Sequence, residues 1–232
     1  MKKKKFIKLL KQRLPKLFKK KFLNSFYIIF LGAISSYSLP PYNYFIINFI
    51  TFSLFFIFIF KKKKGTAHNK SFFQYGWYFG FGYFLFSLYW ISISLTFDQS
   101  FKFLIPVAII LLPAFLAIFY GLITYLFSIF YSKNVITSFF IFSILFGTIE
   151  FVRGSILTGF PWNLIAFSFS NNIYFIQILS IIGTYSFNLI CISLFTVPAL
   201  FILRNSRKEI MVCFIFILMS AGFLIFGNFK NN

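Results

Sequence analysis

Residues 150–162, EFVRGSILTGFPW, combine a pair of opposite charges with a proline and two glycines at the end of a long apolar run. The first part of this stretch closes the run, in which Glu150 and Arg153 stand three positions apart. On a helix that spacing puts both side chains on one face, close enough to pair. Its second part cannot stay helical, because Pro161 has no N–H to donate and Gly159 permits a turn. The stretch therefore predicts a helix that ends near Arg153 and an irregular loop after it.

Two interpretations of the charged pair remain open at this point. Glu150 is one of three acidic residues, and it alone is embedded in an apolar run. An ionisable residue at membrane depth is costly, so by default it marks a candidate functional site. Alternatively, Arg153 anchors the helix at the membrane surface with Glu150 as its structural partner, since buried charge pairs often only fix packing. Trp162 is an amphipathic ring suited to the lipid headgroup level.

The composition is that of a membrane protein. Hydrophobic residues make up 59% of the 232 residues, and 42 residues are Phe. Soluble domains average about 45–50% apolar residues. Here the excess is arranged in long runs, as in membrane spans. We therefore expect an all-α integral membrane protein, a bundle of about seven transmembrane helices; one crossing needs about 20 residues.

The expected spans cover about residues 22–39, 44–60, 72–95, 103–131, 135–152, 173–203 and 210–226. They form one transmembrane domain over residues 22–229, which follows a basic arm over residues 1–21. With the N-terminus in the cytoplasm, 20 of the 23 Lys and Arg residues fall on the cytoplasmic side. The positive-inside rule favours this orientation. It places the stretch 150–162 and the C-terminus on the outer, periplasmic face.

The formal net charge of +20 does not indicate a nucleic-acid-binding protein. Eleven basic residues lie within residues 1–21, before the first span, and the chain contains no nucleic-acid-binding motif. A basic run beside a span is typical of an orientation signal and of contact with anionic lipid headgroups. We therefore expect membrane lipids as partners and no nucleic acid.

The residues that usually bind metals do not form a pattern here. Cys191 and Cys213 both fall in apolar runs, where a cysteine behaves as a small hydrophobe, and a disulfide between them is not expected. His68 is the only histidine and lies in a Lys-rich loop. One histidine and two membrane-embedded cysteines cannot supply a metal site. The sequence predicts neither a metal nor a cofactor.

Three segments resemble the apolipoprotein N-acyltransferase family. The stretch 150–162 closely resembles the family signature, GWYFGFGYFLFSLYW at 76–90 resembles its Gly- and Trp-rich third helix, and IGTYSFN at 182–188 resembles its Gly-x-x-x-x-Asn pattern. The resemblance implies a multi-pass protein of the bacterial cytoplasmic (inner) membrane. It also implies a role in lipoprotein biosynthesis, in which an acyl chain moves from a phospholipid to the N-terminal amine of a lipoprotein's diacylglyceryl-cysteine.

The same segments carry packing predictions. Gly76 and Gly80 form a GxxxG pattern, which lets another helix approach closely. Asn188 is a polar residue in an apolar run, and we expect it to form an interhelical hydrogen bond. Tyr89 and Trp90 near the outer end suit the headgroup level, as aromatic residues do in many membrane proteins.

One departure from the family limits the functional prediction. The family's chemistry is carried by a nitrilase-like domain with a Glu-Lys-Cys triad, and this chain is expected to lack it, as a truncated form or as the membrane half of a split enzyme. We therefore assign no catalytic residue. The alternatives are a non-enzymatic membrane scaffold that binds lipid or a partner subunit, and, with no inverted repeat to support it, a transporter-like bundle.

The candidate site consists of residues that bind substrate or dock a separately encoded nitrilase-like catalytic subunit. These candidates are Glu150, Arg153, Gly159, Phe160, Pro161 and Trp162. The substrates implied by the resemblance are a phospholipid acyl donor and a lipoprotein. Arg153 is expected to meet a phospholipid phosphate as a charge-assisted pair.

Overall fold

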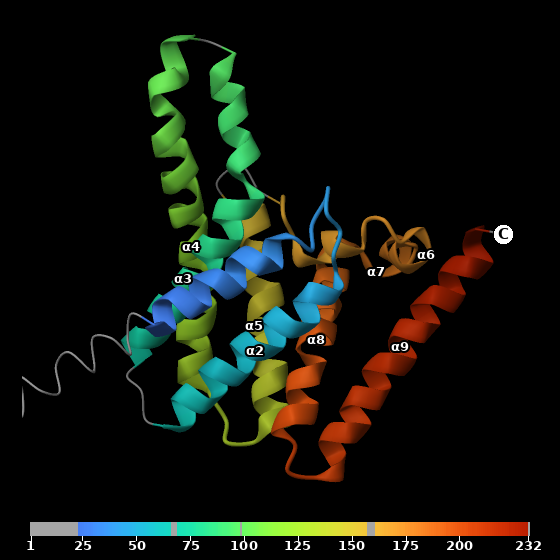
Figure 1. Cartoon of the computed structure of the whole chain (residues 1–232). Coiled ribbons are helices and arrows are strands. Elements are labelled where there is room, and N and C mark those ends of the chain that lie inside the picture. The colour runs from blue at the N-terminus through green and yellow to red at the C-terminus, as the bar shows by residue number, and fades with distance from the viewer. Residues whose placement is uncertain (1–22, 66–68, 98, 157–160, 232) are drawn as a thin grey trace, which may run out of the picture.

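The computed structural model describes residues 23–65, 69–97, 99–156 and 161–231, and these residues form helices without a β-strand (Figure 1). A helix in lipid satisfies its own backbone hydrogen bonds, so long apolar runs fold this way. The basic arm expected over residues 1–21, His68 and Asp98 lie outside the described residues.

The helices have the following bounds. The first half contains the Leu23–Ser36 helix, α2 (Ile46–Lys64), α3 (Asn69–Ser87), the 3₁₀ helices η1 (Tyr89–Thr96) and η2 (Gln99–Leu104), and α4 (Ile105–Phe130). The second half contains α5 (Val135–Ser155), the 3₁₀ helix η3 (Ile165–Phe169), α6 (Ile173–Ile176), α7 (Leu179–Ile182), α8 (Thr184–Leu203) and α9 (Arg207–Asn231).

Four described helices are long and apolar enough to cross a membrane. They are Lys102–Phe130, Val135–Ser155, Thr184–Leu203 and Arg207–Asn231. A fifth is obtained if α3 and η1, which are bent by 45° relative to each other, count as one span. The molecule is therefore a helical membrane protein, while the count of seven spans and their orientation stay predictions.

The segment 173–203, expected as one span, is not a single continuous helix. The segment contains two four-residue helices, α6 and α7, and then α8. Gly183 separates α7 from α8 with φ of 76°, a backbone conformation that favours glycine and ends a right-handed helix. The break lays α6 and α7 across the end of the bundle and leaves α8 as the long helix (Figure 1).

The core of the bundle is built largely from phenylalanine. α5 packs against α4 and α8, and α2 packs against α8. Phe55 stacks on Phe79 with ring centroids 4.3 Å apart, and Phe146 contacts Phe52 at 5.5 Å and Phe142 at 5.4 Å. Aromatic pairs at such distances add to the packing between helices. This core fixes α3 and α5, whose ends carry the candidate site.

The glycines of α3 bring α4 close, as the GxxxG pattern predicts. A Cβ atom on Gly76 would overlap the backbone oxygen of Tyr120, and one on Gly80 would lie 2.8 Å from the Cβ of Tyr120. The Thr124 hydroxyl donates to the carbonyl of Phe72 at 2.6 Å, a hydrogen bond that the short separation permits. The predicted close approach is confirmed.

The two ends of the bundle differ in character (Figure 1). The basic end carries the last turn of α2 and the connections that follow α4 and α8, at residues 131–134 and 204–206. The aromatic end carries the turn at residues 37–45, the loop from Pro161 to η3, α6, α7 and the C-terminal end of α9. Residues separated widely in sequence therefore meet at the aromatic end.

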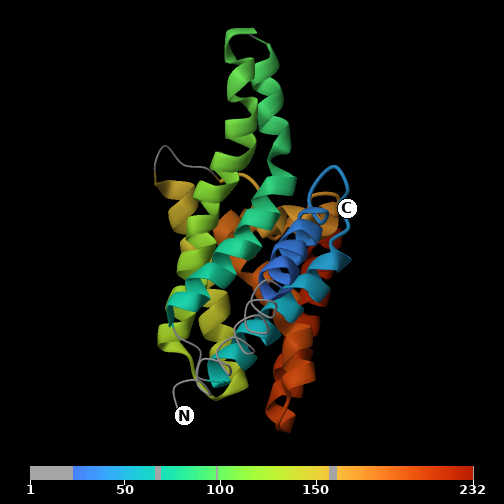
Figure 2. The same cartoon turned by 60° about the vertical axis from the view of Figure 1, so that its left-hand side comes forward.

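An apolar arm of η1, η2 and the first turns of α4 extends beyond the aromatic end (Figures 1 and 2). Phe97 is 87% exposed and Phe103 is 73% exposed. Pro106 stands in the first turn of α4, where a missing N–H costs nothing, and Pro113 lies inside the helix. The 3₁₀ helix η2 directly precedes this turn.

Candidate functional site

The predicted pair of Glu150 and Arg153 forms at the end of α5. The helix starts at an Asn134 N-cap, whose side chain accepts from Thr137 N, and it ends at Ser155. Glu150 Oε2 and Arg153 Nη2 are 2.5 Å apart, and the residues are 1% and 2% exposed. The pairing and the helix end near Arg153 are both confirmed. Both side chains are enclosed by protein.

Arg153 joins three elements. Its Nη1 donates to the carbonyl of Trp162 at 3.2 Å, and its guanidinium stands over the Phe84 ring of α3 at 5.3 Å. The guanidinium thus holds the loop after α5 against the end of α3. In this arrangement it is enclosed by protein, so the geometry supports a positioning role for Arg153. Pairing of Arg153 with a lipid phosphate stays a prediction, and it requires the loop to move.

The loop after Pro161 is fixed to α3 and η1 by long-range contacts. Trp162 stacks on Trp90, with ring centroids 5.3 Å apart and planes 12° apart. Asn163 adopts a positive φ of 57°, and its Nδ2 donates to the carbonyl of Ser87 at 3.2 Å. The Tyr83 hydroxyl donates to the Asn163 carbonyl at 2.9 Å. These contacts place the two indoles side by side at the aromatic end.

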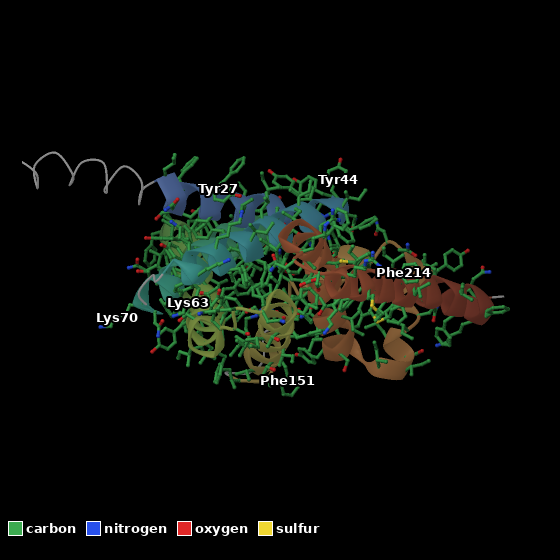
Figure 3. All side chains as sticks on the ribbon, turned by 90° about the horizontal axis from the view of Figure 1, so that it is seen from below. Tyr27, Tyr44, Lys63, Lys70, Phe151 and Phe214 are labelled. Atoms are coloured by element: carbon green, nitrogen blue, oxygen red, sulfur yellow. The ribbon has the colours of Figure 1, made fainter. Side chains whose placement is uncertain are left out.

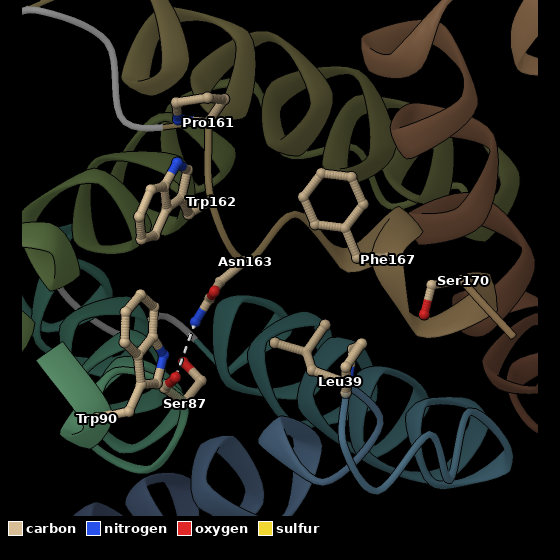
Figure 4. Close-up of a pocket in the computed structure, with 9 residues that line it drawn as sticks. Leu39, Ser87, Trp90, Pro161, Trp162, Asn163, Phe167 and Ser170 are labelled. Carbon is tan, nitrogen blue, oxygen red and sulfur yellow. Dashed lines mark hydrogen bonds between the residues drawn. The ribbon is translucent and has the colours of Figure 1, made fainter.

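A pocket of about 360 Å³ lies between this loop and the ends of the neighbouring helices (Figure 4). Its lining residues are Leu39, Pro40, Ser87, Trp90, Pro161, Trp162, Asn163, Phe167 and Ser170. We call it the tryptophan pocket. Its walls are mainly apolar, and the polar side chains of its lining carry two hydroxyls, one amide and two indole N–H groups. None of the lining residues is ionisable, so the pocket offers binding and orientation rather than acid–base chemistry.

A second cavity of about 210 Å³ lies behind the first. Phe167 and Ser170 line both, and Ile176, Leu179 and Phe187 are among the apolar residues that close the second. Phe167 therefore stands between an open pocket and a smaller apolar one. Figure 4 shows its ring on the η3 side of the tryptophan pocket, across from the two indoles.

Asn188 positions the helix that carries Phe167. Asn188 is fully buried in α8, and its Oδ1 accepts from Ala166 N of η3 at 2.9 Å. The expected interhelical hydrogen bond is thus confirmed, and its partner is the backbone of the short 3₁₀ helix η3. The amide oxygen satisfies a buried backbone N–H, whereas the Nδ2 group of Asn188 makes no hydrogen bond to another described residue.

The structure brings some of the predicted site residues together and adds others. Pro161 and Trp162 line the tryptophan pocket, and Glu150 and Arg153 lie beneath it as a support. Gly159 and Phe160 fall outside the described residues. The lining residues that the sequence did not identify as site candidates are Leu39, Pro40, Ser87, Trp90, Asn163, Phe167 and Ser170. The sequence did single out Trp90 as an aromatic residue near the outer end of a span, a position typical of contact with lipid headgroups. No feature of the sequence marked Asn163 or Phe167 as a pocket residue.

The two cysteines do not contribute to this site. Cys191 and Cys213 are both buried free thiols within α8 and α9, respectively. The Cys213 thiol points to the carbonyl of Val197 at 3.7 Å. Within the described part of the chain, no cluster of three or more His, Cys, Asp or Glu residues is placed to hold a metal ion.

Comparison with known proteins gives consistent matches. A family model described as the apolipoprotein N-acyltransferase N-terminal domain matches residues 31–195. The apolipoprotein N-acyltransferase of Rhizobium etli (strain CIAT 652) is 35% identical over 199 residues, which are 81% of this chain and 36% of that protein. The protein of the same name from Rhodopseudomonas palustris is 31% identical over 207 residues, 86% of this chain and 38% of that protein. The chain spans about a third of the length of the curated relatives it matches.

Proposed function

The chain belongs to the apolipoprotein N-acyltransferase family, and we propose that it is the membrane-embedded part of such an enzyme. The proposed reaction moves an acyl chain from a phospholipid to the N-terminal amine of a lipoprotein's diacylglyceryl-cysteine. The observation that carries the proposal is which residues form the tryptophan pocket. Pro161 and Trp162, from the stretch that resembles the family signature, form one of its walls.

The chemistry of the pocket suits an amphiphilic ligand. A lipid tail gains little by leaving a bilayer for an apolar pocket, because both surroundings are apolar. Selectivity therefore rests on the polar groups at the rim. The Ser87 hydroxyl is buried in the wall of the pocket and makes no hydrogen bond to another described residue, so it keeps an unused hydrogen-bond donor. We propose that Ser87 and Asn163 orient the ester or phosphate region while Trp90, Trp162 and Phe167 contact the acyl chain.

The proposed location is the bacterial inner membrane, with the aromatic end on the outer face. The support is the distribution of charge. The basic end carries Lys61–Lys64, Lys133 and Arg204, whereas the described lining of the tryptophan pocket carries no charge. Positive charges favour the cytoplasmic side of a membrane. In this orientation the pocket opens where lipoproteins are expected to be modified.

The proposed partners follow from the family resemblance. Acyl transfer needs an activated nucleophile and a base beside it. We propose that a nitrilase-like domain or subunit supplies both and docks at the aromatic end. Gly159 and Phe160, which lie outside the described residues, remain docking candidates. The phospholipid donor and the lipoprotein acceptor would then meet above the tryptophan pocket.

A chimaeric enzyme tests the proposal. Residues 1–232 replace the matching N-terminal third of the Rhizobium etli relative, in cells depleted of their own acyltransferase. The mass of a reporter lipoprotein's N-terminus then shows whether a third acyl chain has been added. We expect triacylation by the chimaera, a decrease on Phe167→Trp, which fills the pocket, and a smaller decrease on Ser87→Ala.

The control is Phe130→Trp, the same change at an exposed position near the basic end. It should leave triacylation unchanged. If the chimaera is inserted and stable but never triacylates the reporter, the chain is a scaffold that binds lipid or a partner, and the proposal is wrong. If Phe167→Trp and Phe130→Trp reduced triacylation equally, the claim that the tryptophan pocket binds the substrate would be wrong.

A further inference from the structure

A second pocket, of about 320 Å³, lies near the basic end between the Leu23–Ser36 helix and α2. Tyr27 comes from the first helix, and the other lining residues come from α2: Leu54, Ile57, Phe58, Lys61 and Lys62. The Tyr27 and Phe58 rings are 6.3 Å apart and form one wall. Figure 3 views the molecule from this side and labels Tyr27 and Lys63. The pocket is an apolar groove with two ammonium groups at one end.

The lysines in the last turn of α2 point in two directions, towards the groove and towards α3. Lys61 and Lys62 line the groove, and Lys62 Nζ stands over the Phe58 ring at 5.2 Å. Lys63 turns to α3, where its Nζ donates to Asn69 Oδ1 at 2.5 Å and stands over the Phe72 ring at 5.6 Å. The two groove lysines are thus aimed by the helix, and their apolar stems can cover its wall.

No carboxylate of the described residues is placed to neutralise the groove. The described chain contains two acidic residues, Glu150 and Glu209. Glu150 pairs with Arg153 in the core, and Glu209 accepts from Ser206 N at 2.9 Å at the start of α9. The groove therefore has a positively charged end, which suits an anionic group, and an apolar wall, which suits an acyl chain.

We propose that this groove binds an anionic glycerophospholipid. The phosphate lies between Lys61 and Lys62, and one acyl chain follows Leu54, Ile57 and Phe58. Basic pockets between membrane helices at the cytoplasmic surface are suited to anionic headgroups. A zwitterionic lipid fits less well, because its cationic group would meet two ammonium groups and no described carboxylate. The inference is independent of the acyltransferase proposal, since it uses the opposite end of the molecule.

Native mass spectrometry of the purified full chain tests the proposal. The protein is exposed to equal amounts of phosphatidylglycerol and phosphatidylethanolamine with the same acyl chains, and the ratio of bound lipids is measured. We expect a preference of about tenfold for the anionic lipid, since each lysine near anionic headgroups contributes a several-fold effect. Lys61→Gln/Lys62→Gln should reduce the preference to near one.

Two matched variants distinguish binding in the groove from general attraction of anionic lipid to a positively charged surface. Lys64→Gln/Lys70→Gln removes the same two charges from exposed positions outside the groove and should keep most of the preference. Leu54→Trp fills the groove, keeps every charge, and should weaken binding of the anionic lipid. Equal losses in the two lysine variants, or full binding by Leu54→Trp, would overturn the proposal. So would a wild-type protein that binds both lipids equally.

Discussion

The aromatic end and the basic end of the bundle are held together by different kinds of contact. At the aromatic end the contacts join distant parts of the chain: Arg153 to Phe84, Trp162 to Trp90, and Tyr83 to Asn163. At the basic end the polar contacts are local, as in the Asn134 cap of α5 and the bonds between Ser206 and Glu209. Local contacts survive small changes elsewhere, whereas long-range contacts depend on several elements at once. Substitutions should therefore have larger effects at the aromatic end.

The largest expected effect comes from breaking the buried pair. Arg153→Met leaves the Glu150 carboxylate buried without its cation, and such a change costs about 3–5 kcal/mol. The measurement is the free energy of unfolding in mixed micelles of increasing denaturing detergent. At the basic end, Arg204 is exposed and stands over the Phe201 ring at 4.3 Å. Arg204→Met should cost less than about 1 kcal/mol.

A double variant separates the charge from the packing. Glu150→Leu/Arg153→Met removes both charges, and replacement of a buried pair by apolar side chains is often neutral. We expect it to recover most of the stability that Arg153→Met loses. A double variant that is as unstable as the single one would show that the hydrogen bond to Trp162, rather than the ion pair, dominates.

The second expected effect concerns Gly154, which lies against the Tyr185 side chain of α8. A Cβ atom at Gly154 would overlap the Tyr185 hydroxyl. Gly154→Ala should therefore cost about 1–3 kcal/mol through overpacking. Gly154→Ala/Tyr185→Phe removes the overlapping oxygen and should regain part of the loss, again measured as unfolding free energy. Tyr185→Phe alone serves as the reference for the cycle.

A third and smaller effect tests the stacked indoles. Trp90→Leu and Trp162→Leu each remove one ring, and a favourable ring pair contributes about 0.5–1.5 kcal/mol beyond its buried area. A double-mutant cycle should give a coupling energy in that range. A coupling near zero would mean that Arg153 and Asn163 hold the loop without help from the stack.

The smallest effect is expected at the basic end. Ser206 and Glu209 form a capping box, in which Glu209 Oε2 accepts from Ser206 N at 2.9 Å and Lys208 N donates to Ser206 Oγ at 3.2 Å. Ser206→Ala should cost about 1 kcal/mol. Glu209→Gln should be nearly neutral, because Gln also fits this motif. A loss from Ser206→Ala as large as that from Arg153→Met would contradict the comparison of the two ends.

The sequence predicted what depends on local spacing. The pairing of Glu150 with Arg153 follows from three positions on one helix, and the close approach at Gly76 and Gly80 follows from small residues one turn apart. The stack of Trp90 on Trp162 was not predicted, because the two residues are far apart in sequence and nothing local specifies the meeting. The same holds for Asn188 and its bond to Ala166.

The break at Gly183 shows a different limit of prediction from sequence. Hydrophobicity alone extends the apolar run through residues 173–203, and one glycine in such a run is compatible with a membrane helix. In the structure Gly183 has a positive φ, and α6 lies against α9, where the Tyr174 carbonyl lies close to Gly227. Hydrophobicity does not specify either feature.

The position of both charges on α5 also bears on how the protein is made. A lone Glu or Arg at the centre of a membrane helix raises the free energy of insertion by about 2.5–3.5 kcal/mol. Because Glu150 and Arg153 face each other within one helix, they can enter the bilayer as a neutral unit. Of the other partners of Arg153, Phe84 is synthesised before α5 and Trp162 after it. During biogenesis α5 can thus be inserted before the loop that it later holds in place has left the ribosome.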